Sequence, residues 1–258
     1  MMKRVLLAAI LWCCAASASA QELSVAAASD LASVFPEVAS RFEKETGKKV
    51  RMNFGASGQF LLQIENGAPF DLFFSADVQY VLRLEFEGLI EPGSIYRYAV
   101  GKLVLFVPNG SAVDPAQGLR ALLAPTVRKI AIANPQHAPY GRAAVEALKT
   151  EGLYDALQSK LVLGENISQA AQFVQSGNAD AGIIALSLAL SPKMSSEGRF
   201  AELPSGDYAP LVQAAGILKS SQQKQTAAAF LDFLRRPAIA VLLARYGFAL
   251  PTASTKAK

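Results

Sequence analysis

The sequence predicts an α/β protein of two lobes, each a mostly parallel sheet flanked by helices. The chain has 258 residues, is 52% hydrophobic and contains 18 Gly and 13 Pro, which is typical of a soluble globular protein of this size. Short apolar segments alternate with amphipathic ones at helical spacing, the pattern of strand-helix units. Two longer apolar segments, 96–110 and 208–221, interrupt the alternation, and we interpret them as two crossover strands between the lobes.

The N-terminus has the pattern of a cleavable secretory signal peptide over residues 1–20. MMKR is positively charged, VLLAAILWCCAA is apolar but too short to span a bilayer, and Ala18-Ser19-Ala20 is a small-x-small cleavage site. Both cysteines, Cys13 and Cys14, lie in this segment, so we expect a mature chain from Gln21 without disulfides or cysteine ligands. The residues before these cysteines do not fit a lipidation signal, so we expect a periplasmic protein without a lipid anchor.

The charge balance excludes one class of partner. The formal net charge is +4, and removing Lys3 and Arg4 leaves 23 basic against 21 acidic residues. No basic stripe marks the mature chain, so nothing in it favours binding to nucleic acid.

The first lobe is predicted from three strand-helix units and a return at the C-terminus. Its expected elements are strands over 22–29, 48–57 and 70–75, helices over 31–46, 57–65 and 77–86, a return strand over 208–221 and a closing helix before Pro237. Pro36 removes a helical hydrogen bond, so the first helix should be distorted or begin later. Ser57 is expected to be the N-cap of the second helix, which Asn66 and Gly67 end.

The second lobe repeats the same unit. We expect strands over 127–135, 160–166 and 179–187, and helices over 142–151 and 167–176 that end at Gly152 and Gly177. These boundaries assign residues 21–100 and 213–258 to lobe 1 and residues 101–212 to lobe 2.

Four strand-to-helix turns carry the candidate site. They lie at Ser29, Ser57, Tyr140 and Ile167, and in doubly wound sheets ligands bind at such turns, beyond the carboxyl ends of the strands. Hydroxyls of the two serines and backbone N–H groups of all four residues are neutral donors, and helix N-termini favour anions. A fully ionised oxyanion suits such a site.

Four motifs together resemble the periplasmic molybdate-binding proteins of ABC transporters. The motifs are AAASDL, FGASGQFLLQIENGAPFDLFFSAD, ANPQHAPYGRAAVEAL and GENISQAAQFVQSGNADAGIIALS, and the similarity covers about residues 22 to 254. The resemblance implies a two-lobed Venus-flytrap fold, molybdate or tungstate as ligand, and an inner-membrane ABC permease as partner. It also implies a monomer without cofactor or enzymatic activity.

The resemblance assigns the same four residues to the oxyanion. Ser29 and Ser57 match positions that bind through hydroxyl and backbone N–H, whereas Tyr140 and Ile167 match backbone N–H donors. One departure concerns Ala185, near which many members carry a tyrosine donor. We therefore expect the Tyr140 hydroxyl to supply the missing donor. The metal of molybdate would be held through its oxygens, with no direct protein ligands to a metal ion.

Several nearby residues are expected to be structural. Asp30 should point away from an anion, and the single histidine, His137, has no metal-binding partners at suitable spacing. Arg142 could steer anions, but we expect a solvated side chain. Phe230 and Phe233 fall at core spacing with a neighbouring leucine.

Two other functions are considered. A serine hydrolase would need a Gly-x-Ser-x-Gly turn, but Gln59 stands where the second glycine belongs, so we do not expect an enzyme. A binding protein for another tetrahedral oxyanion such as sulfate remains open, because a neutral donor pocket disfavours anions that carry a proton but does not discriminate size.

Overall fold

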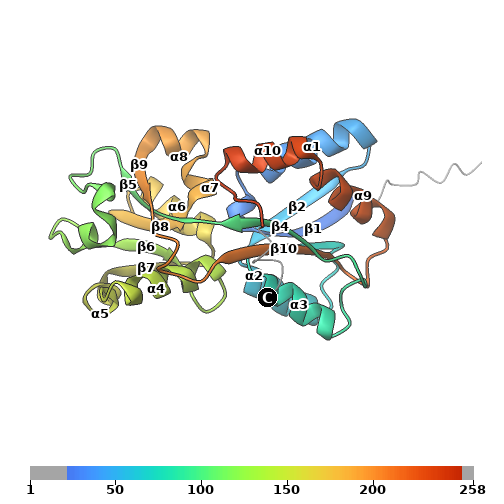
Figure 1. Cartoon of the computed structure of the whole chain (residues 1–258), viewed down its shortest axis with the longest axis horizontal. Helices are drawn as coiled ribbons and strands as arrows, with labels where there is room; N and C mark the ends of the chain where they lie inside the picture. The colour runs from blue at the N-terminus through green and yellow to red at the C-terminus, as the bar shows by residue number, and fades with distance from the viewer. Residues whose placement is uncertain (1–21, 252–258) are drawn as a thin grey trace, which may run out of the picture.

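The computed structural model describes residues 22–251, and these form two lobes side by side (Figure 1). The predicted signal peptide over residues 1–20, with Cys13 and Cys14, lies outside the described residues, as does the segment 252–258. Each lobe contains one five-stranded sheet with helices against it. The predicted two-lobed α/β fold is confirmed.

The sheet of lobe 1 has the order β2-β1-β3-β10-β4. Its strands are β1 (Leu23–Ala28), β2 (Val50–Gly55), β3 (Leu72–Ser75), β4 (Tyr96–Gly101) and β10 (Leu211–Ile217). β1 pairs in parallel with β2 and β3, whereas β10 pairs antiparallel with β3 and with β4. Four strands therefore run in one direction, with β10 reversed, which is the mostly parallel arrangement expected.

Helices cover both faces of this sheet (Figure 1). They are α1 (Phe35–Thr46), α9 (Lys224–Leu234) and α10 (Pro237–Arg245) on one face, and α2 (Ser57–Glu65) and α3 (Val78–Phe86) on the other. Edge-to-face aromatic pairs fill the first interface, with Phe42 and Phe230 ring centroids 5.1 Å apart. Phe230 and Phe233 are buried as predicted.

The start of α1 shows how Pro36 acts. A short 3-10 turn, η1 (Ser29–Leu31), follows β1, and the regular helix begins only at Phe35, with Pro36 in its first turn. A proline costs no hydrogen bond there, because first-turn N–H groups have no intrahelical partner. The predicted late start is confirmed.

The sheet of lobe 2 has the order β7-β6-β8-β5-β9. Its strands are β5 (Leu103–Pro108), β6 (Ile130–Ala133), β7 (Leu161–Gly164), β8 (Ala181–Ala185) and β9 (Gly198–Glu202). Its helices are η2 (Pro115–Leu123), α4 (Pro139–Thr150), α5 (Tyr154–Leu157), η3 (Gln158–Lys160), α6 (Ile167–Gln175), α7 (Leu186–Ala189) and α8 (Pro192–Glu197). β6 is parallel to β7 and β8, and β5 is antiparallel to β8 and β9.

Three sequence predictions of elements need correction. The segment 96–110 is two strands, because the chain leaves the first sheet after Gly101 and enters the second at Leu103. β9 was not predicted, because this edge strand has a single buried residue, Gly198, and no alternation of apolar and polar positions. Helix α4 begins at Pro139 rather than at Arg142, so Tyr140 lies in a helical first turn and not in a loop.

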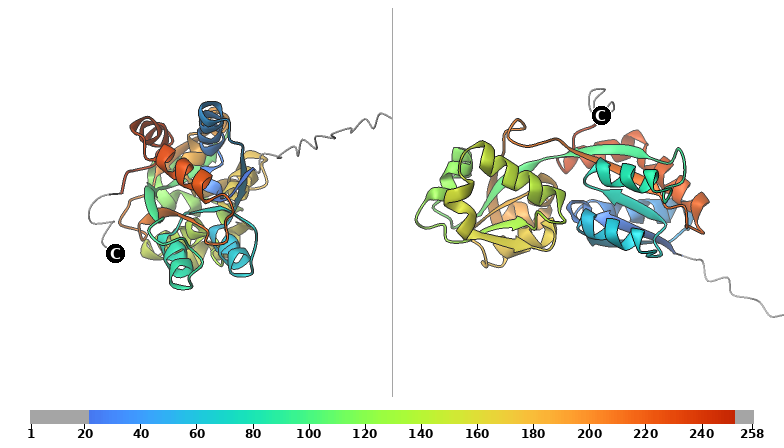
Figure 2. Two further views of the ribbon diagram at one scale, coloured as in Figure 1. Left: turned by 90° about the vertical axis from the view of Figure 1, so that its right-hand side faces the viewer. Right: turned by 90° about the horizontal axis from the view of Figure 1, so that it is seen from below.

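The lobes are joined by two segments and also touch elsewhere. The links run from β4 into β5 and from β9 into β10, and the view from below in Figure 2 shows both on one side of the molecule. Ala28, Ala56 and Ala76, which follow or end strands of lobe 1, belong to the apolar cluster of lobe 2. The small side chains allow the two lobes to pack closely beside the links.

Candidate functional site

A small pocket lies between the lobes where strand ends of lobe 1 meet helix N-termini of lobe 2. About 10 Å³ is open to the centre of a water-sized sphere, which is room for about one water molecule. The lining residues are Ala28, Ser29, Asp30, Gly55, Ala56, Ser57 and Ala76 from lobe 1 and Ala138, Pro139, Tyr140 and Ile167 from lobe 2. All four predicted site residues are thus brought together.

The two serines line the pocket, and each hydroxyl oxygen accepts a hydrogen bond from the backbone. Ser57 Oγ accepts the backbone N–H of Ala76 at 3.0 Å, and Ser29 Oγ accepts that of Ser168 at 3.4 Å. Neither oxygen caps its own helix, and the predicted N-cap role of Ser57 is wrong by one position, because Ala56 is the N-cap. Since each oxygen accepts from the protein, its own O–H is free to donate to a ligand.

Three backbone donors also converge on the pocket. Within residues 22–251, the N–H groups of Ser57, Tyr140 and Ile167 have no hydrogen-bond partner. They lie in the first turns of α2, α4 and α6, where no intrahelical partner exists and the helix dipole is positive. The N–H of Ser29 instead continues the β1–β2 ladder, whose last pair is Ala28 and Gly55. Buried N–H groups without a partner are rare in native proteins, so this cluster indicates a ligand that accepts hydrogen bonds.

The pocket contains no positively charged side chain. Of the residues that line it in the described part of the chain, only Asp30 and Tyr140 are ionisable. An anion bound here would be held by dipoles and hydroxyls rather than by lysine or arginine. Such fixed donors cost no reorganisation and bind strongly where water is excluded.

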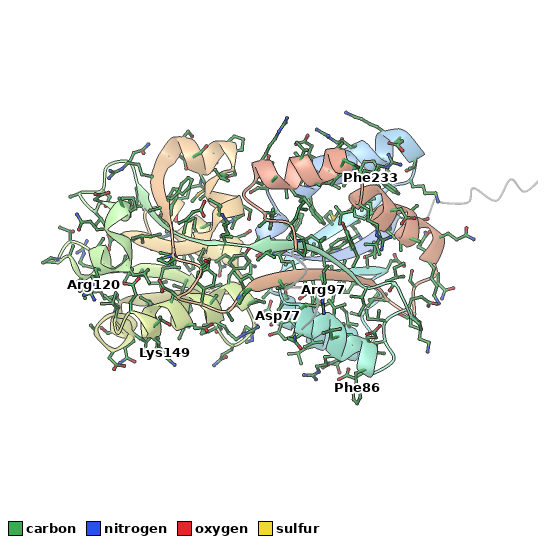
Figure 3. All side chains as sticks on the ribbon, in the orientation of Figure 1. Asp77, Phe86, Arg97, Arg120, Lys149 and Phe233 are labelled. Carbon is green, nitrogen blue, oxygen red and sulfur yellow. The ribbon has the colours of Figure 1, made fainter. Side chains whose placement is uncertain are left out.

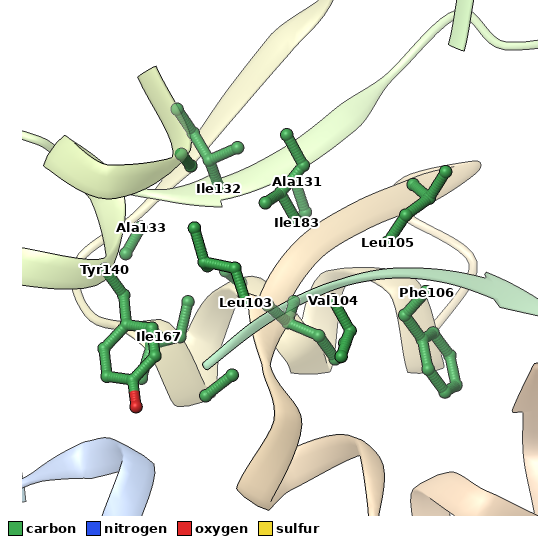
Figure 4. Packing of buried hydrophobic residues seen from close by; sticks show 14 of the residues in the cluster. Leu103, Val104, Leu105, Phe106, Ala131, Ile132, Ala133, Tyr140, Ile167 and Ile183 are labelled. Atoms are coloured by element: carbon green, nitrogen blue, oxygen red, sulfur yellow. The ribbon is translucent and has the colours of Figure 1, made fainter. Parts of the chain in front are cut away.

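The Tyr140 hydroxyl does not have the predicted role. It donates to Asp30 Oδ2 at 2.9 Å and lies 3.2 Å from Gln213 Nε2, which also donates to Asp30 Oδ2. Figure 4 shows the phenol oxygen pointing out of the lobe 2 cluster towards the N-terminal ribbon. The buried carboxylate is a stronger acceptor than any neutral neighbour, so the phenol hydrogen is used there. Tyr140 then faces a ligand through its backbone N–H.

Asp30 is among the residues that line the pocket, and its carboxylate is bonded to Tyr140 and Gln213. Its expected orientation away from an anion stays a prediction. Its side chain is fully buried, and its Oδ1 has no hydrogen-bond partner among the residues of the structure. Burial raises the pKa of Asp30 to about 6, although hydrogen bonds from Gln213 and Tyr140 act to lower it. Burial, together with the nearby Asp30 charge, raises the pKa of the Tyr140 phenol, which keeps this phenol a neutral donor.

Two further serines of lobe 2 fasten the turn η1. Ser168 Oγ donates to the carbonyl oxygen of Ser29 at 2.7 Å, and Ser187 Oγ donates to that of Asp30 at 2.7 Å. Both bonds cross between the lobes. The N-terminal turn of lobe 1 is therefore held against α6 and α7.

A backbone contact joins the two lobes next to the pocket residues Ser57 and Ala138. The Gly58 N–H donates to the His137 carbonyl at 2.8 Å, and a Cβ at position 58 would lie 2.6 Å from the same oxygen. Glycine at this position therefore allows α2 to approach lobe 2. The His137 ring lies against Asn134, with Nε2 3.2 Å from Nδ2.

Arg142 bridges the lobes, which corrects the expectation of a solvated side chain. Its guanidinium pairs with Asp77 at 2.6 Å and donates to the Tyr80 hydroxyl at 2.6 Å. Figure 3 labels Asp77 at the border between the lobes. The Arg142 side chain keeps 41% of its surface exposed, so this pair lies at the rim of the interface.

Sequence reasoning missed Ser168, Ser187 and Gln213. Gln213 is fully buried in β10 and also accepts from the Tyr98 hydroxyl at 2.7 Å. A single amide within the apolar strand LVQAAGI is a signal that could have found it, because a buried amide needs partners. The two serines are common helix N-terminal residues, and nothing in the sequence distinguishes them.

Residues 22–251 contain no group of three or more His, Cys, Asp or Glu side chains placed to hold a metal ion. In the same part of the chain, no helix is long and apolar enough to cross a membrane.

Comparison with known proteins identifies the family. Residues 23–249 match the family model of bacterial extracellular solute-binding proteins. The chain is 42% identical to the molybdate-binding protein of Azotobacter vinelandii over 246 residues, 95% of this chain and 96% of the other, and 38% identical to that of Rhodobacter capsulatus over 231 residues, 90% and 89% of the two. The solved structure of an Azotobacter vinelandii periplasmic molybdate-binding protein superposes with a TM-score of 0.84 at 37% identity, covering 90% of this chain and 100% of that one. The chain therefore belongs to the bacterial extracellular solute-binding proteins and, within them, to the molybdate-binding group that its motifs predicted.

Proposed function

We propose that the protein binds molybdate or tungstate in the periplasm and delivers it to an ABC permease in the inner membrane. The observation that carries this proposal is the cluster of three unpartnered backbone N–H groups, those of Ser57, Tyr140 and Ile167, and two serine hydroxyls in one small pocket. Five neutral donors match the acceptor oxygens of a compact tetrahedral dianion. The relatives named for molybdate decide which dianion to propose.

The donor chemistry argues against anions that carry a proton. A protonated oxyanion brings its own donor, which needs an acceptor, and the proposed ligand contacts are all donors. Sulfate satisfies the same donors and differs from molybdate mainly in size. It therefore remains the competitor to test.

We further propose that the two lobes close on the anion as rigid units. The division is residues 21–100 and 213–258 against residues 101–212, and the sheet membership of β4, β5 and β10 supports it to within one or two residues. Ser29 and Ser57 would bind from lobe 1, and Tyr140 and Ile167 from lobe 2. A ligand with donors on both lobes favours the closed form.

The resemblance to the family supports the remaining assignments that we propose. The protein acts as a binding protein and not as an enzyme, it needs no cofactor, and it works as a periplasmic monomer after removal of residues 1–20. Molybdenum would be held only through its oxygens. The intact mass of the protein from periplasmic extracts tests the cleavage, with a start at Gln21 expected.

A panel of oxyanions tests the ligand. Protein purified without added anion is titrated with molybdate, tungstate, sulfate and phosphate by calorimetry and by thermal melting. A ligand at about 100 times its Kd stabilises the folded protein by roughly 2.7 kcal/mol, so molybdate and tungstate should raise the Tm at concentrations where sulfate and phosphate do not. An equal response to sulfate would favour the sulfate reading, and no response to any of the four would overturn the proposal.

A further inference from the structure

We infer that Asp30 couples anion binding to proton uptake, so that the closed protein holds the anion with the Asp30 carboxyl group neutral. The inference rests on the proposed function and extends it to a residue that the four-residue site does not include. Asp30 would be a positioning residue, acting through Tyr140 and through the charge that it removes from the pocket.

The geometry encloses the carboxyl group completely. Asp30 has no exposed surface and lines the same pocket as Ser29 and Ser57. Its Oδ2 accepts hydrogen bonds from Tyr140 of lobe 2 and from Gln213 of β10, so the Asp30 side chain connects the two lobes. Its Oδ1 has no partner in the described chain, and a protonated carboxyl group has one O–H still to donate.

No neighbouring charge compensates an ionised Asp30. The groups that face it are the Tyr140 phenol from α4, the Gln213 amide from β10 and the backbone N–H groups of Asp30 and Leu31. The Tyr98 phenol lies one hydrogen bond further away, through Gln213, and α6 and α7 contribute the hydroxyls of Ser168 and Ser187 to η1. Among the described residues that act on Asp30, none is a lysine, arginine or histidine.

A dianion in the pocket makes ionisation of Asp30 less favourable still. Like charges in a space from which water is excluded repel strongly. Each tenfold loss in the stability of the ionised carboxylate relative to the protonated form raises the carboxyl pKa by one unit. Burial already places this pKa at about 6, so near neutral pH the group is mostly ionised before binding. With the anion bound, its pKa should lie above neutrality, and binding then takes up close to one proton.

The alternative is an ionised Asp30 that accepts a hydrogen bond from a protonated anion. That arrangement would favour hydrogen phosphate over molybdate, because the carboxylate would supply the missing acceptor. It would also take up no proton from solution. The two possibilities therefore differ in a measurable quantity, the number of protons taken up on binding, which is close to one in the first and zero in the second.

The experiment is calorimetry with molybdate at about pH 7 in two buffers of different ionisation enthalpy. We expect an uptake of roughly 0.5 to 1 proton for the unmodified protein and an affinity that falls up to about tenfold per unit between about pH 7 and pH 8. Asp30→Asn should bind with no proton uptake and no such pH dependence. Asp71→Asn is the matched control, since Asp71 accepts from the Ser24 N–H and the Ser221 hydroxyl away from the pocket, and it should behave as the unmodified protein.

Two results would overturn the inference while leaving the proposed function intact. These are molybdate binding without proton uptake, and uptake that persists in Asp30→Asn and so comes from another group. Tighter binding of phosphate than of molybdate at neutral pH with no proton uptake would contradict both the inference and the proposed function. If Asp30→Asn does not fold, the infrared difference spectrum of the unmodified protein decides, because molybdate should produce the carbonyl band of a protonated carboxyl group. Absence of any oxyanion binding would instead contradict the proposed function itself.

Discussion

At the residue scale, each pocket serine can use its hydroxyl group in two ways, as an acceptor through the oxygen and as a donor through the hydrogen. Ser57 and Ser29 each accept a backbone N–H with the oxygen, from Ala76 and from Ser168, which leaves the hydroxyl hydrogen available to a ligand. Under the proposed function a serine would order the pocket wall and bind the anion at the same time. Alanine at either position would lose both contacts.

Ser29→Ala and Ser57→Ala should each weaken molybdate binding about tenfold to a hundredfold. A hydrogen bond to a charged group contributes roughly 1.5 to 3 kcal/mol, which corresponds to this range of Kd. Ser94→Ala is the control, because Ser94 Oγ also accepts a backbone N–H, from Ile217 at 3.1 Å, but lies outside the pocket. Titration calorimetry measures the three variants, and unchanged affinity in both pocket variants would mean that the hydroxyls do not contact the anion.

Asp30 should make the ligand-free protein less stable as the pH rises. Its pKa is about 6 in the folded chain against a reference of 3.8, so folding favours the neutral form. The stabilising contribution is complete below about pH 4 and is lost as the pH rises through about 6, a change of about 3 kcal/mol. Asp30→Asn should therefore raise the Tm at about pH 7.5 and leave it nearly unchanged at about pH 4. Thermal melts at both pH values without anion test this, and an equal effect at both would contradict it.

At the element scale, α2 reaches lobe 2 through a glycine in its first turn. The Gly58 N–H donates to the His137 carbonyl, and a Cβ at position 58 would come within 2.6 Å of that backbone oxygen. Backbone cannot yield as a flexible side chain would, so an added methyl group must push the lobes apart. The same methyl group would favour α2 itself, because alanine exceeds glycine in helix propensity by about 1 kcal/mol.

Gly58→Ala should therefore uncouple folding from binding. We expect a Tm without anion equal to or above that of the unmodified protein, together with at least about a tenfold loss of molybdate affinity, the equivalent of roughly 1.4 kcal/mol. Gly110→Ala is the control, because no atom lies within 4 Å of a Cβ built there. Retained affinity in Gly58→Ala would show that α2 and α4 can separate without affecting the ligand.

The sequence predicts local features of these elements better than contacts between them. The strand-helix order, the late start at Pro36 and the four pocket residues follow from apolar spacing, from proline chemistry and from turns at strand ends. The partner of the Tyr140 hydroxyl does not, because it depends on how α4 is placed against η1, 110 positions apart in the chain. The break at Lys102 between β4 and β5 was also missed, since an apolar segment that changes sheets has the same periodicity as one that does not.

At the scale of the whole molecule, polar contacts surround the pocket from one lobe to the other. Gln59 donates to Glu165 at 3.0 Å, and the Arg142 pair with Asp77 spans 2.6 Å. With the bonds from Ser168 and Ser187 to η1, they form only when the lobes are together. Their free energy therefore adds to that of the ligand contacts in favouring the closed form.

Arg142→Ala should weaken molybdate binding modestly and in a salt-dependent way. The guanidinium contacts Asp77 and the Tyr80 hydroxyl and lies over the Tyr80 ring at 5.3 Å from its centroid, but it is partly exposed, so its net contribution is about 0.5 to 1 kcal/mol, or twofold to fivefold in Kd. Arg41→Ala removes the same charge and an ion pair of similar exposure within one helix, to Glu37, and should leave the Kd unchanged. Because salt screens a partly exposed pair, the difference between the two variants should shrink in about 0.5 M salt. An equal loss of affinity in both variants would mean that the positive charge of either arginine attracts the anion from a distance. A loss only in Arg142→Ala would mean that the pair with Asp77 forms as the lobes close.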